Sequence, residues 1–94
     1  MSERALTAAI IRYMERLKAA GEPIWWFKVA GGPMQKAGIP DLCVVHKGQS
    51  IWLEVKADRG KTSTLQLHRM KEIEAAGGRT AIVRSVADVM KELS

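Results

Sequence analysis

The residues best suited to chemistry are Asp41 and the triplet Glu54-Val55-Lys56, which follows after twelve intervening residues. Glu54 and Lys56 are two residues apart, so on a strand their side chains project from the same face. If Asp41 joins them from a neighbouring strand, two carboxylates converge on the oxygen-rich site that Mg²⁺ or Mn²⁺ requires. Such a cation polarises a phosphodiester and activates a water, while the adjacent lysine stabilises the charge that develops as the bond breaks.

Glu54 and Lys56 alone also fit an exposed cross-strand pair, which contributes little to stability. Glu3 favours the site, because it precedes Leu6 by three residues and Ile10 by seven. That spacing places its carboxylate at the end of the inward-facing stripe of a helix. A favourable charge at the helix N-terminus explains Glu3 equally well, so the two interpretations stay open.

Gln66 is a further candidate for the site. It shares a helix face with Met70 and Ile73, which points it toward the sheet and toward the same site. The sequence Ser63-Thr64-Leu65-Gln66 also has the form of a capping box, which explains the glutamine without any catalytic role. Taken alone, the two explanations of Gln66 have similar weight.

Seven elements must position these side chains. Apolar spacing and end signals predict helices over residues 3–20 and 64–76 and a last helix starting at Ser85. Residues 24–29, 41–46, 50–56 and 80–83 read as strands. The predicted order is α, β, β, β, α, β, α.

The strand over 24–29 lacks clean alternation, so we expect both of its faces to be covered. Trp25 and Trp26 face opposite sides of this strand; one belongs to the core, and the other is better suited to an interface than to base stacking. The stretch 31–33 breaks the strand, and residues 34–38 read as a flexible basic loop.

The register of the hairpin between the second and third strands decides whether Asp41 can share a face with Glu54. A two-residue turn at Gly48-Gln49, with glycine where a type II′ turn requires it, pairs Lys47 with Ser50 and Asp41 with Lys56. This register gathers the three site residues on one face, whereas a slip by a single residue separates them. A four-residue loop or a bulge would restore the same parity.

With 94 residues, the chain is expected to form one domain, and its composition is that of a folded protein. Its apolar runs are too short to span a membrane, so a cytoplasmic location is expected. The net charge of +5 favours a polyanionic partner, and most of the excess lies in residues 28–69. The basic residues expected to bind DNA phosphates are Lys28, Lys36, Lys47, Arg59, Lys61 and Arg69.

Together, Glu3, the stretch 38–42, Glu54-Val55-Lys56, the stretch 63–66 and Ala75-Ala76-Gly77-Gly78 closely resemble the VRR-NUC family in residues and in order. This is the virus-type replication-repair nuclease group of the PD-(D/E)XK superfamily, and the resemblance spans nearly the whole chain, as in the stand-alone phage and bacterial form. It implies an α/β, restriction-endonuclease-like αβββαβ core with a mixed four-stranded sheet flanked by helices.

The resemblance also implies roles for the site residues. Asp41, Glu54 and the Val55 carbonyl would hold Mg²⁺ or Mn²⁺, and Glu3 would complete the acidic site. Lys56 would orient or polarise the attacking water, and Gln66 would support the site.

We therefore expect a metal-dependent DNA endonuclease that acts on branched DNA such as Holliday junctions. A homodimer would supply two active sites, and a small domain with three tryptophans has apolar surface to bury. The alternative is a non-catalytic basic DNA-binding module in which Asp41 and Glu54 are structural. Because unpaired carboxylates repel phosphates, a metal titration separates the two hypotheses.

Overall fold

The computed structural model describes residues 1–31, 33 and 35–94. The predicted order of elements is confirmed. The predicted break at 31–33 and the predicted loop at 34–38 lie partly outside the described residues, because each includes one residue beyond them. The elements are α1 (Glu3–Ala19), β1 (Ile24–Lys28), β2 (Leu42–His46), β3 (Gln49–Val55), α2 (Thr64–Ala75), β4 (Arg79–Val83) and α3 (Val86–Glu92).

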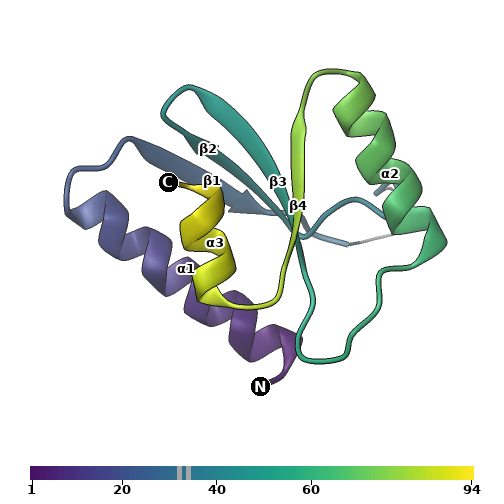
Figure 1. The fold of residues 1–94 in the computed structure, drawn as a ribbon, viewed down its shortest axis with the longest axis horizontal. Coiled ribbons are helices and arrows are strands. Elements are labelled where there is room, and N and C mark those ends of the chain that lie inside the picture. Colours follow the sequence, from purple (N-terminus) through teal and green to yellow (C-terminus); the bar gives the residue numbers. More distant parts are fainter. Residues whose placement is uncertain (32, 34) are drawn as a thin grey trace.

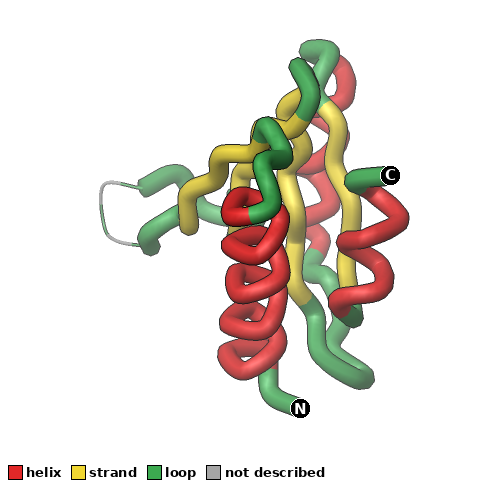
Figure 2. The backbone as a smooth tube through the Cα atoms, turned by 90° about the vertical axis from the view of Figure 1, so that its left-hand side faces the viewer, coloured by secondary structure: helices red, strands yellow, loops and turns green. Residues whose placement is uncertain are grey.

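The four strands form one mixed sheet, as predicted, and their order in it is β1-β2-β3-β4. β1 and β2 are antiparallel, as are β2 and β3, whereas β3 and β4 are parallel and joined through α2. Figure 1 shows α1 and α3 on one side of the sheet and α2 on the other. From the second direction, α1 and α3 lie beside each other (Figure 2), and they are in contact.

The core lies between the sheet and the pair α1 and α3. Strand residues such as Leu42, Ile51 and Leu53 are buried there against Ile10 and Met14 of α1. α1 begins where expected, because the Ser2 side chain accepts a hydrogen bond from the Ala5 amide and caps the helix. On the opposite face of the sheet, α2 packs along β4.

The expectation that β1 is covered on both faces is wrong. β1 is an edge strand, and its side chains alternate: Ile24 is buried and Trp26 packs on the core, whereas Trp25 and Phe27 are 56% and 42% exposed. The apolar character of both faces concealed this alternation in the sequence. Trp26 is therefore the core tryptophan, as the opposite directions of the two indoles required.

The hairpin register keeps the predicted parity but not the predicted turn. His46 pairs with Gln49, so the two turn residues are Lys47 and Gly48, with φ angles of 49° and 82°. Positive φ at both positions is the type I′ geometry, whose twist matches that of the flanking strands. Continuing the register places Asp41 beside Glu54 rather than beside Lys56. Because the shift equals two residues, every side chain keeps its predicted face.

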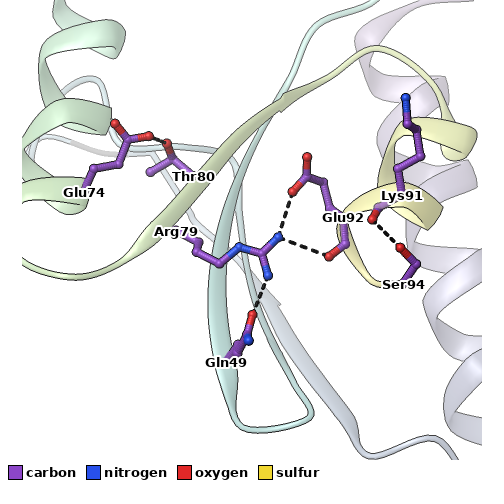
Figure 3. Close-up of polar contacts among 7 residues, drawn as sticks. All are labelled: Gln49, Glu74, Arg79, Thr80, Lys91, Glu92 and Ser94. Atoms are coloured by element: carbon purple, nitrogen blue, oxygen red, sulfur yellow. Dashed lines mark hydrogen bonds and ion pairs between the residues drawn. The ribbon is translucent and has the colours of Figure 1, made fainter.

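At the turn end of the sheet, Arg79 fastens β4 to its neighbours (Figure 3). Its guanidinium donates to the Gln49 side chain and to the Glu92 carboxylate, the latter at 3.0 Å. Thr80, next on β4, donates to Glu74 of α2. These contacts hold helices from both layers to the end of the sheet that lies away from Asp41 and Glu54.

Gly38 allows the loop before β2 to lie directly against α2. Its φ is +79°, and a Cβ there would lie 2.8 Å from Leu65 Cγ and 3.2 Å from both Arg69 Cγ and the Leu65 carbonyl oxygen. Gly48 has a similar φ of +82°, but nothing lies within 4 Å of its Cβ position. A substitution at Gly48 would therefore cause backbone strain alone, whereas a substitution at Gly38 would cause strain and a steric clash.

We predict that Gly48→Ala lowers the free energy of unfolding by about 1–2 kcal/mol, the cost of a left-handed conformation for a residue with a Cβ. Gly38→Ala should cost clearly more, because the clash with Leu65 adds to the same strain. Urea denaturation of both variants measures the difference. Equal losses would mean that the contact between loop and helix has no energetic weight.

Candidate active site

Asp41 lies immediately before β2 and is fixed through its backbone and its side chain. Its carbonyl oxygen accepts a hydrogen bond from the Val29 amide at 2.8 Å, which extends the pairing of β1 and β2 by one step. Its Oδ2 accepts from the Val55 amide, also at 2.8 Å. The carboxylate is therefore held across the hairpin toward β3.

Glu54 is the buried member of the site. Only 1% of the residue is exposed, and it lies on the sheet face that α2 covers. Burial, followed by the negative charge of Asp41, raises the pKa of Glu54 to about 7 against the lowering effect of Lys56. The interpretation of Glu54 and Lys56 as an exposed surface pair is wrong.

Lys56 supplies the nearest positive charge. Its Nζ lies 3.4 Å from Glu54 Oε2, and its side chain is 11% exposed. Its backbone amide donates to the Val83 carbonyl at 3.0 Å, which extends the pairing of β3 with β4 beyond the last strand residue. One ammonium thus lies beside two adjacent carboxyl groups, and its charge opposes the rise in the pKa of Glu54.

Gln66 completes the capping box and also contacts Glu54. Its Oε1 accepts from the Ser63 amide, and the Ser63 hydroxyl accepts from the Gln66 amide, so the capping box at the start of α2 is complete. Its Nε2 donates to Glu54 Oε2 at 3.0 Å. The same side chain therefore fixes the helix N-terminus and orients the buried carboxylate.

Glu3 lies near Lys56 but does not join the carboxylate pair. Glu3 is exposed at the start of α1. Its Oε2 and the Lys56 Cδ lie 3.4 and 3.5 Å from the position that a Cβ of Gly60 would occupy. Among the described residues, no group of three or more His, Cys, Asp or Glu side chains is arranged to hold a metal. The acidic centre is therefore a pair, with Glu3 on its lysine side.

The donor set fits a divalent cation. Asp41 and Glu54 approach closely enough for the charge of one to raise the pKa of the other. Glu54 Oε1 is buried without a hydrogen-bond partner in the described part of the chain. A carboxylate oxygen without a partner is costly in a protein interior, and a hard cation is a ligand that would satisfy it. The Val55 amide binds Asp41, and the Val55 carbonyl stays an expectation from the resemblance.

The basic residues named from the sequence divide into two groups. Lys28, Lys36, Arg59 and Lys61 are exposed and lie in β1 or in loops at the Asp41 end of the sheet. Lys47 does not flank the acidic centre: it lies in the turn at the other end of the hairpin, 3.9 Å from Glu22. The pattern of charges along the chain carried no information on which end of a strand each lysine would reach.

Arg69 braces the loop before β2. Its Nε donates to the Ala37 carbonyl at 2.9 Å, and its Nη1 lies 2.7 Å from Glu72, which lowers the pKa of that carboxyl. Only 19% of its side chain is exposed. Arg69 is therefore engaged within the protein, and the other cations of this region are better placed to meet phosphates.

A hollow of about 270 Å³ opens beside the acidic pair, and we call it the Asp41 hollow. Asp41, Lys36 and Gln35 contribute to its wall, together with backbone around Ala30 and Gly38. Sequence reasoning missed Gln35. The signal that could have found it is its position between two loop glycines and beside Lys36, directly ahead of the Asp41 motif.

In the described residues, no helix is long and apolar enough to cross a membrane. No family model matches the sequence, and no curated protein is significantly similar to it. A solved structure described as a VRR_NUC domain is similar in fold, with a TM-score of 0.70 and 24% sequence identity, over 97% of this chain and 94% of that one. The chain therefore has the fold of a VRR_NUC domain, as its motifs indicated.

Proposed function

We propose that this protein is a nuclease that uses Mg²⁺ or Mn²⁺ to hydrolyse phosphodiester bonds within DNA. The observation that carries the proposal is the buried Glu54 beside Asp41, with one carboxylate oxygen left without a partner in the described residues. A purely structural glutamate would be expected to have both oxygens bonded at this depth. The fold of a VRR_NUC domain supports the same conclusion.

In this proposal Asp41 and Glu54 would hold the cation, which would supply a Lewis acid for the phosphate and lower the pKa of a bound water. The Val55 amide fixes the Asp41 carboxylate, and the Gln66 amide fixes the Glu54 carboxylate beside it. Lys56 is near enough to stabilise the negative charge that develops on the phosphate. Glu3 lies near the Lys56 side chain, beside Gly60.

Branched DNA, such as a Holliday junction, is the proposed substrate, and the proposed assembly is a homodimer. A two-fold pair of sites matches the two-fold symmetry of a junction cut on two strands. Large apolar side chains, among them Trp25, Val45 and Ile82, are exposed in the single chain and favour self-association. The cytoplasm of a bacterial or phage-infected cell, where DNA is repaired and recombined, is the compartment that this activity implies.

The first prediction from this proposal is that Asp41→Ala and Glu54→Ala each abolish cleavage but bind DNA as tightly as the wild type or more tightly. Each change removes a metal ligand and also a negative charge that repels phosphate. Labelled four-way junction, flap and duplex are incubated with each variant in Mg²⁺ or Mn²⁺ for cleavage, and the same preparations are used for gel shifts.

Two outcomes of that experiment discriminate among the hypotheses. If the two alanine variants lose both DNA binding and cleavage, the carboxylates have a structural role. A wild-type protein that binds DNA, gains nothing from either cation and cuts no substrate would be the non-catalytic module instead. Lys56→Ala is the companion variant, because it removes the ammonium and leaves both carboxylates in place.

A second prediction concerns pH. Folded, metal-free Glu54 keeps its proton up to about pH 7, whereas an ordinary glutamate loses it near 4.5. The folded state binds more protons between these values, so the free energy of unfolding falls as the pH rises through that window, by at most about 1.4 kcal/mol per pH unit. Urea denaturation in EDTA between pH 4 and 8 measures this slope.

Glu54→Gln is the control, because the isosteric amide does not titrate. Its unfolding profile should lack the Glu54 contribution, and adding Mg²⁺ should reduce that contribution in the wild type by favouring the ionised carboxylate. Parallel profiles for the wild type and Glu54→Gln would mean that Glu54 does not titrate in this window.

The third prediction is that DNA binding weakens steeply with salt and that the cations near Asp41 cause this. Replacing Lys36 and Lys61 by alanine should reduce the slope of log K against log salt by about 2, since each phosphate contact contributes about 0.9. The matched control removes the same charge elsewhere, through Lys47→Ala with Lys91→Ala on α3. A control that loses as much affinity would show a general charge effect rather than a binding surface.

A further inference from the structure

The sheet face that carries Asp41 and Glu54 continues into a second hollow, of about 420 Å³. Phe27 of β1 and Trp52 of β3 form its aromatic walls, and Gln35 and Ile39 come from the loop before β2. We call it the aromatic hollow. It shares Gln35 and Ile39 with the Asp41 hollow, so the two are neighbouring parts of one depression.

The strand register fixes how far the aromatic hollow lies from the carboxylates. Phe27, Cys43 and Trp52 stand level across β1, β2 and β3. Asp41 and Glu54 are each two residues further along the same strands, which puts them on the same face. Two residues of strand correspond to about 7 Å. The aromatic hollow and the acidic pair therefore lie on the same face of the sheet, two residues apart along the strands.

Its surface is suited to a flat, apolar ring with polar edges. The rings of Phe27 and Trp52 meet edge to face, with their centroids 6.3 Å apart. The ring centroids of Phe27 and Trp25 are 5.6 Å apart. Phe27 is 42% exposed, although it lies on the face that adjoins the proposed catalytic centre. The Gln35 amide can both donate and accept hydrogen bonds, as the edge of a nucleobase requires. The exposed Lys36 lies in the wall of the adjoining hollow.

We propose that the aromatic hollow binds an unpaired nucleobase of the DNA strand whose phosphate lies at Asp41 and Glu54. This inference rests on the proposed nuclease function and specifies its substrate class. Aromatic side chains stack on bases of any sequence, but a base inside a duplex has no free face to offer. The hollow thus favours cuts beside unpaired nucleotides, as at flaps and opened branch points, over cuts in continuous duplex.

The test uses a flap and a matched duplex, each with 2-aminopurine in place of one base next to the branch point or at the equivalent paired position. Binding is measured in EDTA and low salt, so that no strand is cut. The wild type should quench the flap probe, because stacking quenches this fluorophore, and leave the duplex probe nearly unchanged. Phe27→Ala should remove the quenching and weaken flap binding by roughly 5- to 100-fold, with little effect on duplex binding.

Two variants serve as controls. Phe27→Tyr keeps the ring and should restore the quenching, which excludes a folding defect as its cause. Leu67→Ala removes an exposed apolar side chain from α2, outside the aromatic hollow, and should behave as the wild type. Sedimentation velocity is measured for the wild type, Phe27→Ala and Phe27→Tyr.

Equal quenching by the wild type and Phe27→Ala would overturn the inference. Absence of quenching in the wild type would also overturn it. If Phe27→Ala in addition changes the protein from a dimer to a monomer, a second copy of the chain covers the hollow. The nuclease proposal is tested separately. Quenching without cleavage in Mg²⁺ or Mn²⁺ would reject the nuclease and retain the base site. Cleavage with the same preference for flap over duplex in Phe27→Ala as in the wild type would retain the nuclease and reject the base site.

Discussion

Glu54 is a carboxylate held in the protein interior beside a second carboxylate, and this constraint determines much of the surrounding structure. Burial and the charge of Asp41 both oppose its ionisation, and Lys56 compensates only part of the cost. A folded chain tolerates such a centre only if other elements impose it. Here the Val55 amide holds Asp41 from one side, and Gln66 holds Glu54 from the other.

The position of α2 follows from this constraint. The helix lies on the acidic face of the sheet, so its first turn can place an amide against Glu54. It also anchors the loop before Asp41, through the close approach at Gly38 and through the Arg69 bond to the Ala37 carbonyl. One helix thus fixes the loop on the Asp41 side and the carboxylate on the Glu54 side, while α1 and α3 form the core on the opposite face.

Element order, the capping box and the parity of the hairpin could be predicted from the sequence because each depends on neighbouring residues. The turn was misplaced by one residue, because Lys47 adopts a left-handed conformation that its residue type does not announce. The exposure of Phe27 and the remoteness of Lys47 could not be predicted, because both depend on which strand lies at the edge and which end of the hairpin holds the site. Local patterns do not contain that information.

The double use of Gln66 has a consequence for which residues this position accepts. A capping box is served equally well by glutamine or glutamate in an ordinary helix, because only a side-chain oxygen is needed to meet the backbone amide. In this protein the Nε2 atom of the same side-chain amide must also donate a hydrogen bond to Glu54. A glutamate would satisfy the helix, but it could not donate this hydrogen bond and would bring a further acidic group beside Asp41 and Glu54. Either glutamine or glutamate would start this helix, but the hydrogen bond to Glu54, twelve residues earlier on β3, allows only glutamine.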